Sequence, residues 1–317
     1  MSRPKITIFS SLEACSLGHM PRPNFPRESD LASERPSMPS EMEGVTQRVS
    51  NTEHLTLRHI TIESEEAAKA IGKPKGQYIT LEFPALWQMT PTIKESVIHT
   101  LSQQIEGLAR GVFQGKPKGQ RVVLVAGLGN RHLTADAIGP LTTDQVSATY
   151  HIKQTVPRLF RQMGCAGVCV LSPGVVAETG IDAGDVICDV AKAISPDLVV
   201  CVDALAARSV DRLATTIQLT DTGITPGSGV GNHRKALSKE TLGIPCIAIG
   251  TPTVVSAFTL LYDLLQETGL GAHFEDMIKN KGQNDFFVCP KDIDCAVKEI
   301  GSMVASAINR LWGVEKL

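Results

Sequence analysis

From residue 121 onward, short apolar runs rich in β-branched residues alternate with stretches of helical periodicity. We expect strands over residues 121–126, 167–171, 197–202, 214–219 and 244–249. We expect helices over residues 138–151, 182–194 and 253–267. Apolar runs of this length are typical of strands buried on both faces, and their alternation with helices predicts a mostly parallel sheet flanked by helices. Polar and apolar residues alternate in 214–219, which indicates an antiparallel or edge strand.

The chain before residue 121 adds strands and a helix to this α/β pattern. Alternation predicts strands over 54–62 and 77–83, and three- to four-residue spacing predicts a helix over 92–108. A last helix is expected over 293–312. The sequence therefore predicts one α/β domain over residues 44–317, with extra strands at its N-terminal end.

Residues 1–43 differ from the rest of the chain. Five of its six prolines crowd together at positions 21, 23, 26, 36 and 39, with Ser and Glu between them. Such a segment is unsuited to a long helix and has too few apolar residues for a core. We therefore predict that it is a tail, a linker or a removable segment.

The overall composition argues against several classes of protein. The formal net charge is −2 and aromatic residues make up 4% of the 317 residues, so no nucleic-acid or membrane-surface partner is expected. No apolar run approaches the roughly 18 residues of a membrane-spanning helix. The eight cysteines form no CxxC pair and are interpreted as reduced core thiols of a cytoplasmic protein.

Two aspartates follow the apolar runs and are the strongest candidate functional residues. Asp136 follows the run 121–126 through a Gly-rich turn, and Asp203 closes the run 197–202. Open α/β sheets bind ligands at the carboxyl ends of their strands, so the two side chains are expected to meet there. Two carboxylates that share a proton can activate water and protonate a leaving nitrogen, with no cofactor and no metal. Asp136 as a helix N-cap, and Asp203 as a turn residue or partner of Arg208, are the structural alternatives.

The Gly-rich turns do not complete a nucleotide-binding motif. Gly127 and Gly129 follow a strand, but His132 stands where a dinucleotide motif needs its third glycine, and no Walker sequence follows. A second glycine cluster spans 226–232 and is interpreted as a surface loop. The basic residues His233, Arg234 and Lys235 after it are expected to begin a helix in solvent.

Several segments of the sequence resemble those of a known protein family. They are 67–74 with 78–80, 127–140, 172–174 with 179–181, 202–209, 215–224 through 226–232, 235–245 and 248–254. In these runs the chain resembles the germination proteases of spore-forming bacteria, over roughly residues 44–317. The resemblance implies an aspartic-type endopeptidase with Asp136 and Asp203 as its catalytic pair. It also implies a fold related to the hydrogenase-maturation endopeptidases.

The resemblance further implies a biological setting. Family members are homotetrameric zymogens that remove an N-terminal propeptide by self-cleavage during sporulation. Their substrates are small acid-soluble DNA-binding spore proteins, degraded at germination in the cytoplasm of the forespore and spore core. Residues 1–43 would then be the propeptide, and the nearest match to the family's processing pattern is 27–32.

Two other functions stay open from the residues alone. His132 lies near Asp136 in the sequence, as expected of a nickel-dependent maturation peptidase. The unusual N-terminal segment is compatible instead with a catalytically silent, zymogen-like binding protein.

Overall fold

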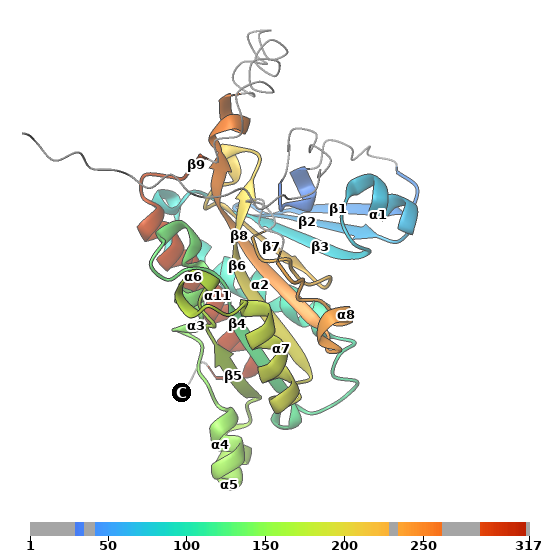
Figure 1. Ribbon diagram of the computed structural model, residues 1–317, viewed down its shortest axis with the longest axis vertical. Helices are drawn as coiled ribbons and strands as arrows, with labels where there is room; N and C mark the ends of the chain where they lie inside the picture. The colour runs from blue at the N-terminus through green and yellow to red at the C-terminus, as the bar shows by residue number, and fades with distance from the viewer. Residues whose placement is uncertain (1–28, 35–41, 228–233, 262–285, 315–317) are drawn as a thin grey trace, which may run out of the picture.

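The computed structural model describes residues 29–34, 42–227, 234–261 and 286–314. Within these residues one sheet has the strand order β1-β2-β3-β7-β8-β6-β4-β5, and β9 pairs with β8 (Figure 1). The strands are β1 (Val45–Asn51), β2 (Thr56–Ile62), β3 (Gly76–Glu82), β4 (Val122–Gly127), β5 (Gly167–Leu171), β6 (Leu198–Ala207), β7 (Thr216–Thr220), β8 (Cys246–Ser256) and β9 (Phe287–Val288).

The sheet is mixed, so the prediction of a mostly parallel sheet is correct for only part of it. Strands β5, β4, β6 and β8 are parallel, whereas β1, β2, β3 and β7 pair antiparallel with their neighbours. Residues 52–55 connect β1 to β2 and are too few for a parallel crossover. The extra N-terminal strands are confirmed. Strand β7 is antiparallel as expected, but it lies between β3 and β8 and not at an edge.

Helices cover both faces of the sheet. The α-helices are α1 (Glu65–Ile71), α2 (Pro91–Ala109), α3 (Ile138–Thr143), α4 (Tyr150–Thr155), α5 (Pro157–Met163), α6 (Val176–Thr179), α7 (Ala183–Ile194), α8 (Lys239–Leu242) and α11 (Ile293–Trp312). Short 3₁₀ turns are η1 (Ala32–Glu34), η2 (Leu86–Gln88), η3 (Lys118–Gln120), η4 (Thr134–Asp136) and η5 (Val210–Arg212). Helices α2, α7 and α11 confirm the predicted helices in these regions.

Two predicted helices are wrong in part. The helix expected over 138–151 ends at Thr143, and a separate helix begins only at Tyr150. The helix expected over 253–267 begins later, because β8 continues to Ser256 beside β6. Residues 257–261 are helical, and the remainder of that prediction lies outside the described residues. The β-branched residues Thr251, Thr253, Val254 and Val255 favour this extension of the strand.

The core has two layers because successive strand residues point to opposite faces. Val123 and Val125 of β4 pack on one side with buried residues of α2 and α11, such as Leu101. Leu124 and Ala126 face the other side and pack with α7, for example against Ile187. This second side is called the α7 face below. It matters for function because it carries the candidate acid Asp203.

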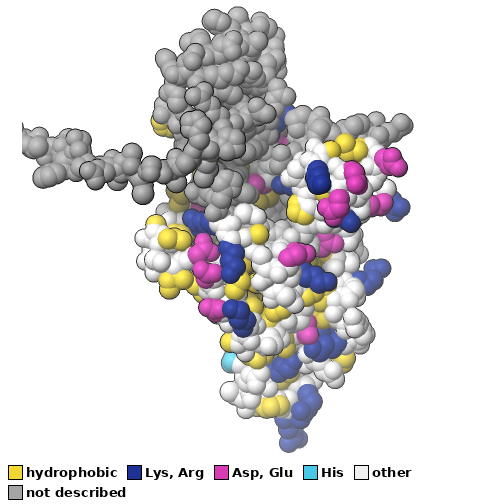
Figure 2. Space-filling model, turned by 45° about the vertical axis from the view of Figure 1, so that its right-hand side comes forward, with side chains coloured by type: hydrophobic (Ala, Val, Ile, Leu, Met, Phe, Trp, Pro, Cys, Tyr) yellow, Lys and Arg dark blue, Asp and Glu magenta, His cyan; other side chains and the backbone are white. Residues whose placement is uncertain are grey.

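Five cysteines are buried and unpaired, as expected for core thiols; they are Cys165, Cys169, Cys188, Cys201 and Cys246. Cys289 and Cys295 are exposed, which differs from the expectation. No helix in the described part of the chain is long and apolar enough to cross a membrane. Figure 2 shows acidic and basic side chains interspersed on one face, with basic side chains at its lower end.

Candidate active site

Asp203 lies within β6, in the parallel half of the sheet, and is only 5% exposed. The prediction that it closes the strand is wrong, because β6 continues to Ala207. The extension pairs with β8 through an irregularity between Leu205 and Ala206. The apolar residues after Asp203 continue the strand. The carboxyl group of Asp203 is therefore surrounded by protein and does not lie at an open strand end.

Asp136 lies in η4, in the loop between β4 and α3. Its Oδ2 accepts a hydrogen bond of 2.8 Å from the backbone N–H of Asn130. The alternative role as an N-cap is not observed, since α3 has Ala137 as its N-cap and no side-chain capping bond. The hydroxyl of Thr253 in β8 donates to the carbonyl of Ala135 over 2.6 Å. These contacts fix the loop, and with it the carboxylate, against the sheet.

Two glycines bring that loop close to β6. A Cβ on Gly139 would lie 2.2 Å from the carbonyl oxygen of Leu128 and 2.5 Å from that of Val202. A Cβ on Gly127 would lie 2.3 Å from the carbonyl oxygen of Gly139. Backbone therefore packs on backbone between α3, β4 and β6, as glycine alone permits. Gly139, three residues after Asp136, is thereby held against Val202, the residue that precedes Asp203.

Burial is the largest effect on the pKa of both acids. Burial raises the pKa of Asp203 well above its ordinary value, and the negative charge of Asp136 raises it further. The backbone N–H of Ala204, 2.9 Å from Oδ1, and Arg234 act in the opposite direction on that pKa. Burial also raises the pKa of Asp136, against the effects of the Asn130 N–H and Arg234.

The two acids differ in the form that their surroundings favour. Asp203 is the member that favours the protonated form, and Asp136 has a hydrogen-bond donor for its charged form. A neighbouring acid and carboxylate can donate and accept protons in the same reaction. The arrangement is therefore suited to general acid–base chemistry on a bound water and a substrate.

Sequence comparison places the chain in a known family. A family model described as germination protease matches residues 27–283. The chain belongs to the germination protease family. Germination protease of Clostridium perfringens is 37% identical over 280 residues, covering 81% of this chain and 84% of that protein. Germination protease of Caldanaerobacter subterraneus is 36% identical over 306 residues, covering 89% and 92%. That of Bacillus licheniformis is 40% identical over 237 residues, covering 74% and 63%.

The region matched by the germination protease model includes Asp136 and Asp203. It also includes residues 29–34, which the structure places against β6: the backbone N–H of Asp30 donates to the carbonyl of Ala206 over 3.1 Å. The charge of Asp30 also raises the pKa of Asp203. A short N-terminal segment of this germination protease family member therefore lies beside one of its candidate acids.

Sequence analysis missed Arg234 as a site residue. It was expected in solvent at the start of a helix, but it is half-buried and α8 begins only at Lys239. Its positive charge lowers the pKa of both Asp136 and Asp203. The sequence feature that could have identified Arg234 is its position soon after the glycine cluster 226–232, because a glycine-rich segment allows the chain to approach a site closely.

The other features singled out from the sequence are His132 and the glycine cluster 226–232. His132 is exposed, and its Nε2 lies 3.9 Å from Oε1 of Glu178. In the described part of the chain, no group of three or more His, Cys, Asp or Glu side chains is arranged to hold a metal ion. Most of the glycine cluster 226–232, together with His233, lies outside the described residues.

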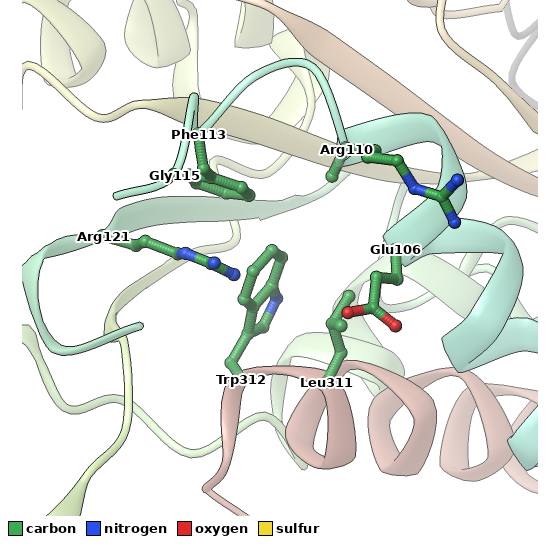
Figure 3. A pocket seen from close by; sticks show the side chains of 8 residues that line it. Glu106, Arg110, Phe113, Gly115, Arg121, Leu311 and Trp312 are labelled. Carbon is green, nitrogen blue, oxygen red and sulfur yellow. The ribbon is translucent and has the colours of Figure 1, made fainter. Parts of the chain in front are cut away.

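A cavity of about 260 Å³ lies at the other end of the parallel strands (Figure 3). Arg121, directly before β4, lies over the Phe113 ring at 4.5 Å from its centroid. The rings of Phe113 and Trp312 meet edge to face at 5.5 Å. Asp136 follows the opposite end of β4, so this cavity is separate from the candidate active site.

The raised pKa of Asp203 predicts a pH-dependent effect on stability. The folded chain holds this proton more tightly than the unfolded chain, so wild type loses relative stability as the pH rises above about 4. Asparagine does not titrate. The free energy of unfolding of Asp203→Asn, relative to that of wild type, should therefore rise by about 1–3 kcal/mol from pH 4 to pH 8.

Urea unfolding at the two pH values measures this gain. Asp189→Asn is the control, because Asp189 is exposed on α7 and forms an ion pair with Lys192 of the same helix. A constant difference between Asp203→Asn and wild type at both pH values would contradict the raised pKa.

Proposed function

We propose that this member of the germination protease family is an aspartic-type endopeptidase that begins the degradation of small acid-soluble DNA-binding spore proteins during germination. The observation that carries this proposal is the buried Asp203, whose pKa is raised by burial and by the charge of Asp136. The family match supports a peptidase, and the acid pair supplies a way to hydrolyse a peptide bond.

In the proposed reaction, ionised Asp136 takes a proton from a water molecule as the water oxygen attacks the substrate carbonyl carbon. Protonated Asp203 stabilises the oxygen that becomes negative, and a proton passes from the pair to the leaving nitrogen as the C–N bond breaks. The pair returns to its single-proton state with no net proton gained or lost. Arg234 lowers both pKa values and so favours the charged form of the carboxylate that accepts the proton.

We further propose that the chain is a zymogen that processes its own N-terminal segment, with residues 1–43 as propeptide and 44–317 as peptidase domain. Residues 29–34, within the proposed processing region, lie beside Asp203, which supports self-processing. We also propose a homotetramer in the cytoplasm of the forespore and spore core, and family membership supports this proposal. We also propose that the parallel strands β5-β4-β6-β8 are the part of the fold related to hydrogenase-maturation endopeptidases.

Purified full-length chain mixed with a small acid-soluble spore protein from pH 5 to pH 8 tests the function. We expect a few discrete internal fragments by intact-mass spectrometry, together with loss of N-terminal residues from the enzyme itself. A scrambled sequence of the same composition is the matched control and should be cut at least about tenfold more slowly. Equal cleavage of both proteins, or of neither at any pH, would refute the proposed substrate.

A further inference from the structure

Three large apolar side chains are exposed on the two loops that follow β4 and β5. Leu133 is 57% exposed, Val176 42% and Ile181 54%. Strands β4 and β5 are parallel neighbours, so the two loops begin side by side at the same edge of the sheet. This is the edge at which Asp136 follows β4. The exposed apolar side chains therefore belong to the same end of the molecule as the candidate acid.

Leu133 lies in the short loop that the carboxylate of Asp136 closes. The N–H of Leu133 donates to the carbonyl of Asn130 over 3.1 Å, and the N–H of Asp136 donates to the carbonyl of Leu133 over 2.8 Å. The Asp136 carboxylate accepts the N–H of Asn130 over 2.8 Å. A bond from the first to the fourth residue of a turn brings their Cα atoms within about 7 Å, which is roughly two residues of an extended peptide. A peptide placed for hydrolysis beside Asp136 therefore passes Leu133.

The second loop lies against the first. Nε2 of His132 lies 3.9 Å from Oε1 of Glu178, a residue of α6. The hydroxyl of Thr179, at the end of α6, accepts the N–H of Ile181 over 3.1 Å and fixes the turn that follows. The exposed apolar side chains of both loops thus form one surface, which is called the apolar rim below and consists of Leu133, Val176 and Ile181.

Charged groups border the apolar rim and are paired with one another. The guanidinium of Arg131 donates to both carboxylate oxygens of Asp144, over 2.5 Å and 3.0 Å. His132 faces Glu178 in the same way. These pairs leave apolar contact as the main interaction that the rim offers. An apolar patch with a polar border is typical of a surface that binds another chain.

We infer that the apolar rim is a specificity site that binds a large apolar side chain of the substrate, within about three residues of the bond that is cut. A peptide in position for hydrolysis covers the rim and removes these side chains from water. Loss of one such contact should weaken binding by about five- to fiftyfold. The inference rests on the proposed peptidase function, and it states which side chains of the substrate that function selects.

The test compares serine substitutions on the rim with one at the opposite end of the parallel strands. Leu133→Ser and Ile181→Ser remove apolar surface from the rim, and Leu133→Met replaces it. Leu159→Ser is the matched control, because Leu159 is 47% exposed on α5, just before the first residue of β5. Each change is made in the full-length chain and again in a chain carrying Asp136→Asn, which prevents cleavage under the proposed mechanism.

Two probes separate binding from cleavage. A labelled small acid-soluble spore protein is titrated with the Asp136→Asn chains, and fluorescence anisotropy gives its affinity. Mass spectrometry maps the cuts that wild type makes in the same protein, and peptides spanning those cuts give kcat/KM. Each peptide is also made with serine in place of the large apolar residue nearest to the cut.

Leu133→Ser and Ile181→Ser should each weaken binding and lower kcat/KM at least about fivefold, whereas Leu159→Ser should stay within about twofold. Leu133→Met should recover most of the loss seen in Leu133→Ser. The serine peptide should be cut at least about fivefold more slowly by wild type. It should be cut less than about twofold more slowly than the natural peptide by Leu133→Ser, because the same contact is lost only once.

Equal affinities of Leu133→Ser and Leu159→Ser would overturn the inference, as would independent losses from the serine changes in enzyme and peptide. A cut with no large apolar residue within about three positions would overturn it as well. A changed oligomeric state of Leu133→Ser, measured by light scattering, would assign the rim to contact between copies of the chain instead. Absence of cleavage by wild type would refute the proposed function, and the anisotropy comparison would still decide the rim.

Discussion

Replacing either Asp136 or Asp203 with asparagine should reduce the rate of spore-protein hydrolysis by about 10³-fold or more. Each substitution removes one partner of the proton exchange, and general acid–base catalysis contributes roughly 10²- to 10⁴-fold. Because the two acids act as a unit, the double variant should be little slower than the slower single variant. Rates of fragment formation, measured by mass spectrometry at matched enzyme concentration, give these ratios.

Asp189→Asn is the matched control, since this carboxylate is exposed on α7 and forms an ion pair with Lys192. Its activity should stay within about twofold of wild type. Wild-type cleavage by either single active-site variant would exclude that acid from the reaction. Multiplicative losses in the double variant would instead indicate two residues that act independently.

Gly139→Ala should lower the free energy of unfolding by about 2–3 kcal/mol and reduce activity at least about tenfold. The added Cβ would meet backbone oxygens of Leu128 and Val202, which have no flexible side chain to move aside. Relief of this clash requires α3 to move away from β4 and β6. Asp136 is separated from α3 by Ala137 alone, and small displacements of a catalytic group are costly to the rate.

Gly107→Ala makes the same chemical change where nothing lies within 4 Å of the new Cβ. Gly107 lies in α2, so alanine should stabilise the protein by about 0.5–1 kcal/mol and leave activity unchanged. Urea unfolding and the hydrolysis assay compare the two variants. Similar behaviour of both would show that close packing at Gly139 is not what positions the loop.

Local patterns in the sequence predicted the elements whose surroundings are uniform. Residues 122–126 and 167–171 are strands because apolar runs that contain several valines suit a sheet that is covered on both sides. The long helices α2, α7 and α11 follow from apolar residues at helical spacing. The sequence pattern over 253–256 fits either a helix or a strand, and these residues form a strand because this part of β8 pairs with β6.

The sequence by itself determined the strand and helix segments, the family and the identity of Asp136 and Asp203 as the candidate acids. Tertiary structure alone decided that β7 separates β3 from β8, which places Gln218 in one row with Asp203. It also decided that Glu34 meets the amides of Arg208 and Ser209. Strand order depends on pairing between distant segments, and backbone N–H groups are the same in almost every residue. Local sequence patterns therefore contain the acids but not the contacts that residues 29–34 make beside them.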